Sequence, residues 1–471
     1  NKRKTYEGKF FKQTADIDMS ELEYWYSIGY DFGSASYYFK GTYDGDNHKI
    51  SNMYTSSNYN RDNWGCFRDI EGTVKNLTLE NCEVENSSGV EMAGILARCA
   101  KGATIVNCHV INGKVRSAGD NVGGLIGNIY AYENDTVIKN CSFEGEVIGN
   151  SNVGGIVGTS EGADISECYF KGNLTGGNNT GGILGYVPRN SVTLSTSKKT
   201  TIKDCYTKVA LTGSGSFIGG ILGRVQGEAE VTDCYVTGTI KGSAVGGIVG
   251  AYMGRSLEVK NNVSLLDSIN VGTSPVGRIL GYDPVDDGLT LKDNYAWAGM
   301  RVNGNVVADS SIDGKGFLYY KGELGKQLSD VFTNKDVWTF EDNKLPVLKN
   351  ISNAQDNALP SYFEGHLFEG EGTEQNPYII SSYDDLAKLS DLTNSKGETF
   401  SGKFFKQTAD IIYYDYYNSW IAIKDFEGTY DGNGKTVVNV LGIFNNLKGT
   451  VKNLSVENIY YSNDVTERDF G

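Results

Sequence analysis

The chain is poor in proline and histidine and has no long apolar run. Only 6 of its 471 residues are proline, whereas 60 are glycine. Glycine without proline excludes a collagen-type helix and indicates many tight turns. No apolar run approaches the roughly 20 residues needed to span a bilayer. The opening residues, NKRKTYEGKFFKQ, contain no apolar signal core, so we expect any export signal to precede Asn1.

A basic cluster and a metal-binding motif are also missing. The 58 Asp and Glu residues outnumber the 43 Lys and Arg residues, and the net charge of −15 argues against nucleic acid as a partner. The three histidines, His48, His109 and His366, lie far apart, and none belongs to the HExxH motif of zinc proteases. The eight cysteines form no CxxC pair. We therefore expect no catalytic residue, no metal and no cofactor in this chain.

Internal repetition is abundant. A GG(I/L)(V/I/L)G pattern recurs with start-to-start spacings of 30, 31, 27, 38, 27 and 31 residues. Its copies, of which the first and last are degenerate, start at Ala93, Gly123, Gly154, Gly181, Gly219, Gly246 and Gly277. A fixed period of this length predicts a stack of similar structural units.

Each interval also contains a short apolar run followed by Asn, Asp or Glu and then by one slot residue. The slot residues are Cys82, Cys108, Cys141, Cys168, Cys205 and Cys234, followed by Asn262 and Asn294. Stacked strands bring Cα atoms to about 4.8 Å, so the spacing alone allows disulfides. A slot that also takes Asn instead favours an inward ladder of small, reduced side chains.

Each repeat of about 30 residues thus carries three short β-type runs separated by Gly, Asn, Asp or Ser turns. One such coil cannot bury its own apolar side chains, whereas stacked coils bury a continuous column. The sequence predicts an all-β fold: a right-handed parallel β-helix (β-solenoid) of about eight coils. We also expect a small α-containing closing segment and the start of a second β module.

A longer repeat contains the shorter one. GKFFKQTADI at 8–17 recurs at 402–411, and GTVKNL at 72–77 recurs at 449–454. We therefore expect an opening β region at 1–62, a solenoid at 63–308, a closing segment with a short helix at 309–350, a linker at 351–375, and the start of a second, truncated module at 376–471.

Aromatic clusters supply the candidate ligand-contact residues. Trp25 and Trp420 occupy the same module position, which favours a core role. The surrounding tyrosines differ between the two copies and are candidates for stacking on sugar rings. These residues are Tyr24, Tyr26, Tyr37, Tyr38, Tyr413 and Tyr416. Asp44 and Asp431, in a shared TYDG, could be calcium ligands, but Asp-Gly between extended runs favours a hairpin turn.

The GG(I/L)(V/I/L)G elements resemble the GLUG motif. The flanking runs GTEQNPYIIS, GKFFKQTADI, FKGTYDGDNHKI and GTVKNL are similar to modules around GLUG repeats in large surface proteins of gut and oral bacteria. These include the region ahead of the catalytic domain in immunoglobulin A metallopeptidases. The resemblance covers nearly the whole chain. It implies a β-solenoid body and an adhesive role, and it carries no catalytic residue onto this sequence.

We therefore expect a non-enzymatic, extracellular or cell-surface bacterial repeat protein. It would act as an adhesin, stalk or interaction scaffold for a host or microbial surface glycan or protein. The alternatives are a carbohydrate-binding solenoid and a polysaccharide-degrading β-helix enzyme. Acid pairs at Asp286–Asp287 and Asp384–Asp385 would suit an enzyme, but each stands at a turn or helix start, where Asp is common. Open ends of the stack would also allow end-to-end self-association.

Overall fold

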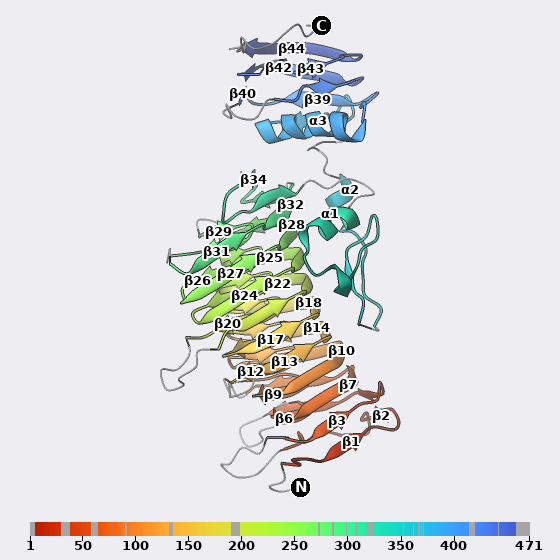
Figure 1. The fold of residues 1–471 in the computed structure, drawn as a ribbon, viewed down its shortest axis with the longest axis vertical. Coiled ribbons are helices and arrows are strands. Elements are labelled where there is room, and N and C mark those ends of the chain that lie inside the picture. Colours follow the sequence, from red (N-terminus) through yellow and green to blue (C-terminus); the bar gives the residue numbers. More distant parts are fainter. Residues whose placement is uncertain are drawn as a thin grey trace. The chain divides into compact units, whose positions relative to one another are not determined.

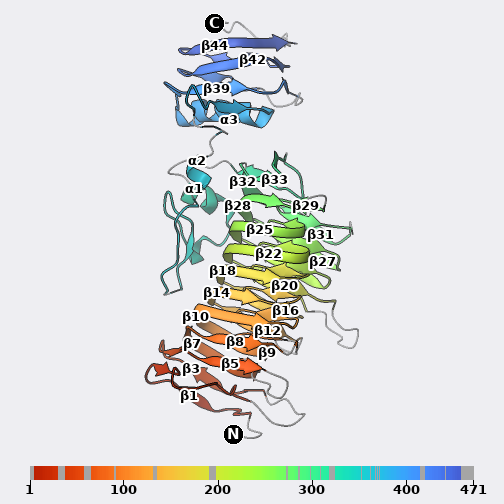
Figure 2. The same ribbon diagram turned by 180° about the vertical axis from the view of Figure 1, so that it is seen from behind.

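A computed structural model divides the chain into two compact units, unit 1 (Asn1–Leu359) and unit 2 (Pro360–Gly471). Both are built mainly from short strands (Figures 1 and 2). The division falls within the predicted linker at 351–375. The structure describes residues 5–457 except 30–37, 58–64, 88, 90–91, 131–134, 190–197, 272–273, 285–286, 298, 308, 318–323, 352, 361, 366–367, 369, 371, 414–419 and 441.

Unit 1 is a stack of coils in which successive coils add a short strand to each of up to three columns (Figure 1). In the first column every strand pairs in parallel with the next. Its ten strands are β1 (Phe10–Lys12), β3 (Thr42–Asp44), β7 (Thr73–Glu80), β10 (Thr104–Ser117), β13 (Thr136–Lys139), β17 (Ala163–Ser166), β21 (Thr200–Lys203), β24 (Glu228–Thr232), β27 (Ser256–Lys260) and β31 (Leu289–Lys292).

The second column follows the first after a corner in the chain, and strands β7 and β10 run through that corner into it. Its other strands are β2 (Ile17–Asp18), β4 (Lys49–Ser51), β14 (Ser142–Ile148), β18 (Tyr169–Gly176), β22 (Tyr206–Gly219), β25 (Tyr235–Gly246), β28 (Val263–Asn270), β32 (Tyr295–Trp297) and β35 (Lys315–Phe317). Strands β5 (Tyr54–Ser57) and β8 (Glu83–Asn86) pair beside the later part of β10.

The third column is an eight-stranded parallel sheet. It comprises β6 (Phe67–Ile70), β9 (Ala97–Ala100), β12 (Ile126–Ile129), β16 (Val157–Ser160), β20 (Leu184–Val187), β23 (Leu222–Val225), β26 (Val249–Tyr252) and β30 (Leu280–Tyr282). The short strands β11 (Val122–Gly123), β15 (Val153–Gly154), β19 (Thr180–Gly181) and β29 (Val276–Gly277) lead into it. Inward side chains of all three columns form the core.

The parallel β-solenoid predicted from the repeats is confirmed, but the expected number of about eight coils is too low. The first column of unit 1 alone stacks ten strands, and unit 2 adds four more, β38 (Tyr378–Ile380), β39 (Phe404–Gln407), β42 (Thr429–Val438) and β44 (Thr450–Glu457). The coils were missed because residues 1–62 carry neither a GG pair nor a slot cysteine. Strands β1 and β3 nevertheless pair in register with β7 through the same ladder.

Close approach of neighbouring coils explains the GG pairs. A Cβ added to the second glycine of each pair would lie 2.0–2.2 Å from a carbonyl oxygen of the next coil. This holds along the column Gly124, Gly155, Gly182, Gly220 and Gly247. Real Cβ atoms do not approach oxygen so closely, so a side chain at any of these positions would force the coils apart.

Left-handed corner residues explain the Asn, Asp or Glu before the slot. Asn107, Asn140, Glu167, Asp204, Asp233, Asn261 and Asp293 all have φ between +51° and +55°. Asn and Asp tolerate this conformation better than other residues with a side chain. The corner turns the chain from the first column into the second and points the following slot side chain inward.

The slot holds five cysteines and not the expected six. The strand register places Cys108 opposite Leu77, which follows the left-handed Asn76. Cys82 lies one corner later, after a second left-handed residue, Asn81. This coil has two left-handed corners, Asn76 and Asn81, and each is followed by an apolar residue. The local motif does not distinguish them, so Cys82 was predicted in the slot that Leu77 occupies.

The slot side chains point inward and donate hydrogen bonds to the backbone. The Cys168 Sγ lies 3.1 Å from the carbonyl oxygen of Ser166 and 3.7 Å from that of Ile138 on the preceding coil. Asn262 Nδ2 donates to the carbonyl oxygen of Val231 on its preceding coil at 2.9 Å. Cys and Asn both suit this slot, because each donates to a carbonyl oxygen of the preceding coil. The inward ladder is confirmed.

The eight cysteines are buried and none is bridged to another. Burial raises the pKa of the Cys82 thiol to about 11 and that of Cys99 to about 12, because a buried thiolate would lose its hydration. The thiols of Cys82 and Cys99 are therefore protonated at neutral pH and act as donors.

Arg278 ends the glycine column. It occupies the position of the second glycine in the last GG element, and its backbone N–H donates to Asp313 Oδ1 at 3.0 Å. The buried guanidinium bonds Asp309 Oδ1 at 3.1 Å and the carbonyl oxygen of Gly314 at 3.2 Å. The carbonyl oxygen of Ile312 accepts the backbone N–H groups of Ile279 and Leu280, which on other coils donate to the next coil. A side chain fits here because no further glycine stacks on it. Nearby, β33 (Arg301–Val302) and β34 (Asn305–Val306) form an antiparallel pair.

Helices are few and short. The closing segment contains α1 (Leu324–Val331), the 3-10 turn η1 (Lys335–Val337) and the strands β36 (Trp338–Thr339) and β37 (Val347–Leu348). Unit 2 begins with α2 (Tyr362–Gly365), and α3 (Tyr383–Lys396) starts at a capping box between Ser382 and Asp385. Within the described ranges, no helix has the length and apolar character needed to cross a membrane.

Unit 2 repeats the opening coils of unit 1. Its strands are β38 (Tyr378–Ile380), β39 (Phe404–Gln407), β40 (Ile411–Ile412), β41 (Ile423–Lys424), β42 (Thr429–Val438), β43 (Phe444–Asn445) and β44 (Thr450–Glu457). The Gln407 amide donates to the carbonyl oxygens of Ala409 and Thr436 and accepts from Tyr430. Gln13 forms the same three hydrogen bonds at matching positions in unit 1.

Gly155→Ala should destabilise unit 1 strongly. Its Cβ would lie 2.2 Å from the oxygen of Gly182 and 2.3 Å from the Phe170 ring. We expect the free energy of unfolding to fall by about 3 kcal/mol. Gly304→Ala is the control, because Gly304 has a φ of +80° but open space around it, and it should cost only about 1 kcal/mol. Equal losses in denaturant titrations would contradict the close-approach account.

Cys234→Asn should be tolerated, whereas Cys234→Asp should not. The new amide would donate to the carbonyl oxygen of Ile202, as the thiol does, and we expect a change in stability within about 1 kcal/mol. An aspartate would place a buried oxygen against that carbonyl and should cost about 3 kcal/mol or more. Calorimetric melting of both variants checks this. Equal losses would show that the slot does not select a donor.

Candidate interaction surface

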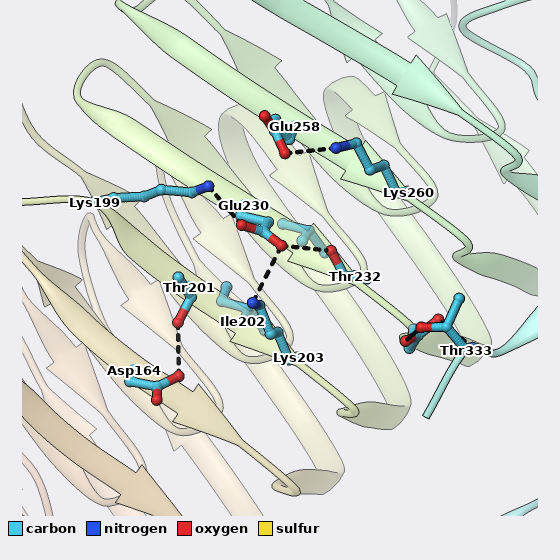
Figure 3. Close-up of polar contacts among 12 residues, drawn as sticks. Asp164, Lys199, Thr201, Ile202, Lys203, Glu230, Thr232, Glu258, Lys260 and Thr333 are labelled. Carbon is cyan, nitrogen blue, oxygen red and sulfur yellow. Dashed lines mark hydrogen bonds and ion pairs between the residues drawn. The ribbon is translucent and has the colours of Figure 1, made fainter. Parts of the chain in front are cut away.

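The outer side of the first column carries charged and hydroxyl side chains that bond from coil to coil. Figure 3 shows this face on strands β17, β21 and β24. Thr201 Oγ1 donates to Asp164 Oδ1 at 2.7 Å. The Nζ atoms of Lys199 and Lys203 lie 2.5 and 3.2 Å from the carboxylate oxygens of Glu230. Each carboxylate thus has a donor on a neighbouring strand.

These contacts leave the face without a concentration of one charge. Desolvation opposes ionisation of Glu230, yet hydrogen bonds from the two lysines hold the pKa of its carboxyl below the ordinary value. On the next strand, Lys260 Nζ lies 2.7 Å from Glu258 Oε2. Exposed pairs of this kind contribute little to stability individually, but they offset the repulsion between like charges on adjacent strands, such as Glu230 opposite Glu258. On these strands Asp164, Glu230 and Glu258 are matched in number by Lys199, Lys203 and Lys260, so their formal charges balance.

The second column carries an aromatic stack that the chain itself covers. Tyr169, Tyr206 and Tyr235 stand on successive coils with ring centroids 4.8 and 5.0 Å apart and planes within 8°. Residues 324–351 and 353–357, here called the strap, lie along them (Figures 1 and 2). Trp338 packs 5.7 Å from the Tyr235 ring, whose hydroxyl donates to the carbonyl oxygen of Pro346 at 2.6 Å. This aromatic surface is therefore occupied by the chain's own closing segment.

The strap also satisfies three acidic corner residues on successive coils. Asn350 Nδ2 donates to Glu167 at 2.9 Å, and Asn334 Nδ2 donates to Asp204 at 2.8 Å. The backbone N–H of Thr333 donates to Asp233 at 3.0 Å, and its hydroxyl donates at 2.5 Å. Three stacked carboxyls would repel one another, and the strap supplies their donors.

Burial raises the pKa of the Asp204 carboxyl to about 6, although the hydrogen bond from Asn334 opposes the rise and the Asp233 carboxylate adds to it. The closing segment predicted at 309–350 thus has a chemical reason for its position. Sequence reasoning missed where it binds. The available signal was a tyrosine directly after the slot cysteine in these three coils, whereas the other two slot cysteines are followed by His109 and Ser142.

The structure separates the predicted ligand-contact tyrosines. Tyr24 and Tyr26 lie together, with ring centroids 6.3 Å apart in an edge-to-face arrangement. Tyr26 is 46% exposed. Tyr38 is half-buried elsewhere, with Lys101 Nζ 4.3 Å from its ring centroid. Tyr413 is buried against Tyr383. The two remaining candidates, Tyr37 and Tyr416, lie outside the described residues.

The tryptophans at the shared module position have the same role in both copies. Trp25 Nε1 donates to the carbonyl oxygen of Cys66 at 3.0 Å, and Trp420 Nε1 donates to that of Gly442 at 2.6 Å. Both indoles are half-buried and tie neighbouring coils together. This supports the structural interpretation of the two residues.

The TYDG aspartates are used by their own corners. Asp44 Oδ1 accepts the N–H of Asp46 at 3.0 Å and Asn76 Nδ2 at 2.9 Å, and Lys75 Nζ lies 3.0 Å from Oδ2. Asp431 has the equivalent three partners in unit 2. The turn interpretation is confirmed, but the turn is no hairpin. The strands on either side, β3 and β4, both run parallel to β7.

A hollow of about 300 Å³ lies at the last coil of unit 1, lined by Lys292, Asp293, Asn294, Ser310 and Lys315 among others. Lys315 Nζ lies 3.4 Å from Asp293 Oδ1, so the charges pair with each other. Among the residues whose positions are given above, no three His, Cys, Asp or Glu side chains gather closely enough to hold a metal ion. Asp385 of the acid pair at 384–385 caps α3, and Asp286 lies outside the described residues.

Comparison with known proteins identifies the repeats. Residues 118–148, 149–175 and 214–241 match the GLUG motif family, which confirms the resemblance on these repeats. Over 237 residues the chain is 28% identical to halomucin of Haloquadratum walsbyi, a stretch that covers 48% of this chain and 2% of halomucin. A crystal structure from Bacteroides ovatus, described as a candidate immunoglobulin A1 protease, is 20% identical with a TM-score of 0.41. The structural match covers 74% of this chain and 87% of the chain from Bacteroides ovatus.

Asp204→Asn should weaken the dependence of stability on pH. The folded chain holds the Asp204 proton more tightly than the unfolded chain does, because its pKa rises from 3.8 to about 6. This stabilisation is complete below pH 3.8 and is lost as the pH rises to about 6. Between these values, the unsubstituted chain should lose roughly 2 kcal/mol more than Asp204→Asn. Melting curves across this range, with Asp164→Asn as an exposed control, check the prediction. Parallel curves for all three would contradict it.

Proposed function

We propose that this chain is a non-catalytic scaffold of an exported or cell-surface protein, in which stacked coils form a stalk and present an interaction surface. The observation that carries the proposal is the unbroken register of unit 1, whose first column pairs ten parallel strands without interruption. Such a stack grows by adding coils and is stiff because each coil bonds to both neighbours. Each sequence repeat therefore adds length to the stack and does not build a cleft.

The outer surfaces support this proposal. On the outer side of the first column the Glu230 carboxylate is paired with Lys199 and Lys203, and the corner residues Glu167 and Asp204 are bonded by the strap. Neither arrangement leaves an acid and a base facing a common hollow, which glycoside hydrolysis would require. The GLUG repeats occupy the coils themselves, so they serve the stack.

A second candidate function, binding of a surface glycan, rests on the Tyr24 and Tyr26 pair. Edge-to-face tyrosines, one of them 46% exposed, form a platform on which an apolar sugar face can stack. The pair stands at the opening coils of unit 1, beside the half-buried Trp25.

Binding of the full chain to an array of immobilised glycans, mucins and matrix proteins tests both ideas. We expect at least one ligand to bind and to be recovered uncleaved. Tyr26→Ala should weaken binding by about tenfold, because the exposed ring would be the main contact. Leu22→Ala removes an exposed apolar side chain from the same segment and should leave binding unchanged. Cleavage of the ligand would overturn the non-catalytic role. An absence of binding across the array would overturn the adhesive one.

A further inference from the structure

The first strand of unit 1 has a twin in unit 2 with the same sequence and different surroundings. GKFFKQTADI forms β1 in unit 1 and β39 in unit 2. On one side, both strands pair in the same register: Phe11 lies opposite Tyr43, and Phe405 lies opposite Tyr430. Any difference between the twins therefore reflects what lies on their other side.

The local geometry of the two strands is the same. Tyr6 has a φ of +57° and its ring meets that of Phe11 at 5.3 Å and 87°. Phe400 has a φ of +55° and its ring meets that of Phe405 at 5.2 Å and 89°. The turn before the strand and the ring that follows it are thus arranged in nearly the same way in the two copies.

In unit 2 the other side of the strand is covered. Strand β38 pairs in parallel with β39, with Tyr378 opposite Phe405 and Ile380 opposite Gln407. The Phe405 ring lies 5.2 Å from that of Tyr378 and 5.3 Å from that of Phe368. The backbone N–H of Phe404 donates to Gly372 at 3.1 Å. A strand and its aromatic residues thus close this end of the stack.

Helix α3 completes the cover. Its apolar face, Leu386, Leu389 and Leu392, is buried. Its polar face bonds the neighbouring segment: Asn394 Nδ2 donates to the carbonyl oxygen of Ala422 at 2.8 Å, and Thr393 Oγ1 accepts the N–H of Lys424 at 3.0 Å. Strand β38 and helix α3 therefore act together as one strand–helix cap, residues 376–396.

In unit 1 the corresponding side chains are open. Phe11 is 39% exposed and Ile17 is 40% exposed, whereas their twins Phe405 and Ile411 are 1% and 2% exposed. Phe10 is 82% exposed. In the described part of the chain, β1 has no strand partner on the side away from β3. An apolar strand edge of this kind is a template for a further strand.

We propose that the β1 edge, formed by Phe10, Phe11 and Ile17, is a binding surface for a strand–helix segment with the chemistry of residues 376–396. The segment adds a short apolar strand parallel to β1, in the register that Tyr378 and Ile380 adopt on β39. A serine-capped helix with leucines on one face then covers the end of the core. The identical sequence and geometry of the twin strand carry the proposal, which does not depend on the proposed function.

A synthetic peptide of residues 368–398 tests this on the full chain. We expect saturable binding, with slower hydrogen exchange at the amides of Phe10 and Thr14. These match Phe404 and Thr408, whose amides bond Gly372 and Ile380 in unit 2. Phe11→Asp in the chain should weaken binding by at least about tenfold. Leu447→Asp, at an exposed apolar residue of unit 2, should not. A peptide with Leu386→Asp and Leu389→Asp should fail to bind the unsubstituted chain.

A second measurement covers weak binding of a free peptide. Asn1 aligns with Ser395, so residues 368–394 can be placed directly before Asn1 with the natural spacing. This extended chain should show protected amides at Phe10 and Thr14 without added peptide, and it should no longer bind the peptide. Absent protection would overturn the proposal. So would peptide binding that Phe11→Asp leaves unchanged. Concentration-dependent dimerisation that Phe11→Asp abolishes, without peptide binding, would assign the edge to a second copy and would also overturn it.

Discussion

Hydrogen bonding between stacked coils, at a spacing of about 4.8 Å, is the constraint on which the structure depends. Every residue meets the residues at the same position on the coils before and after it, so each position is selected for stacking on itself. The glycine column shows the limit of this rule, since a Cβ at Gly155 would lie 2.2 Å from the oxygen of Gly182. The left-handed corner at Asn140 or Asp204 follows from the same need, because each coil must turn at the same place.

Stacking like on like has different consequences for different side chains. Thiols, amides and rings stack favourably, as the slot of Cys168 and Asn262 and the planar rings of Tyr206 and Tyr235 show. Carboxylates do not, because equal charges on adjacent coils repel. The chain meets this in two ways. Glu230 receives lysines from its own face, whereas Asp204 and its neighbours receive donors from the strap. The strap therefore supplies donors to carboxylates that repeat from coil to coil, in addition to covering the tyrosine stack.

A stack of strands also has two ends, and each must be closed or paired. Arg278 closes the glycine column, because its side chain occupies the place of a further coil and bonds Asp309 and Gly314. In unit 2 the strand β38 and the helix α3 close the N-terminal end of the stack, where β39 begins the coils. The β1 edge of unit 1 exposes the same apolar side chains that these elements bury in unit 2. The ends of the stack therefore carry packing requirements of their own, in addition to those of its faces.

The repeats in the sequence determined the class of fold, the inward slot and the need for paired glycines, because these properties depend on one position compared with itself along the chain. They did not determine the register, and Cys82 was assigned to the wrong corner because two left-handed asparagines precede apolar residues in one coil. Opening coils without the motif were not counted for the same reason. The position of the strap, the burial of Tyr413 and the exposure of Phe11 beside its buried twin Phe405 were decided only by tertiary structure. Each depends on which distant segment covers a surface, and no periodic pattern records that.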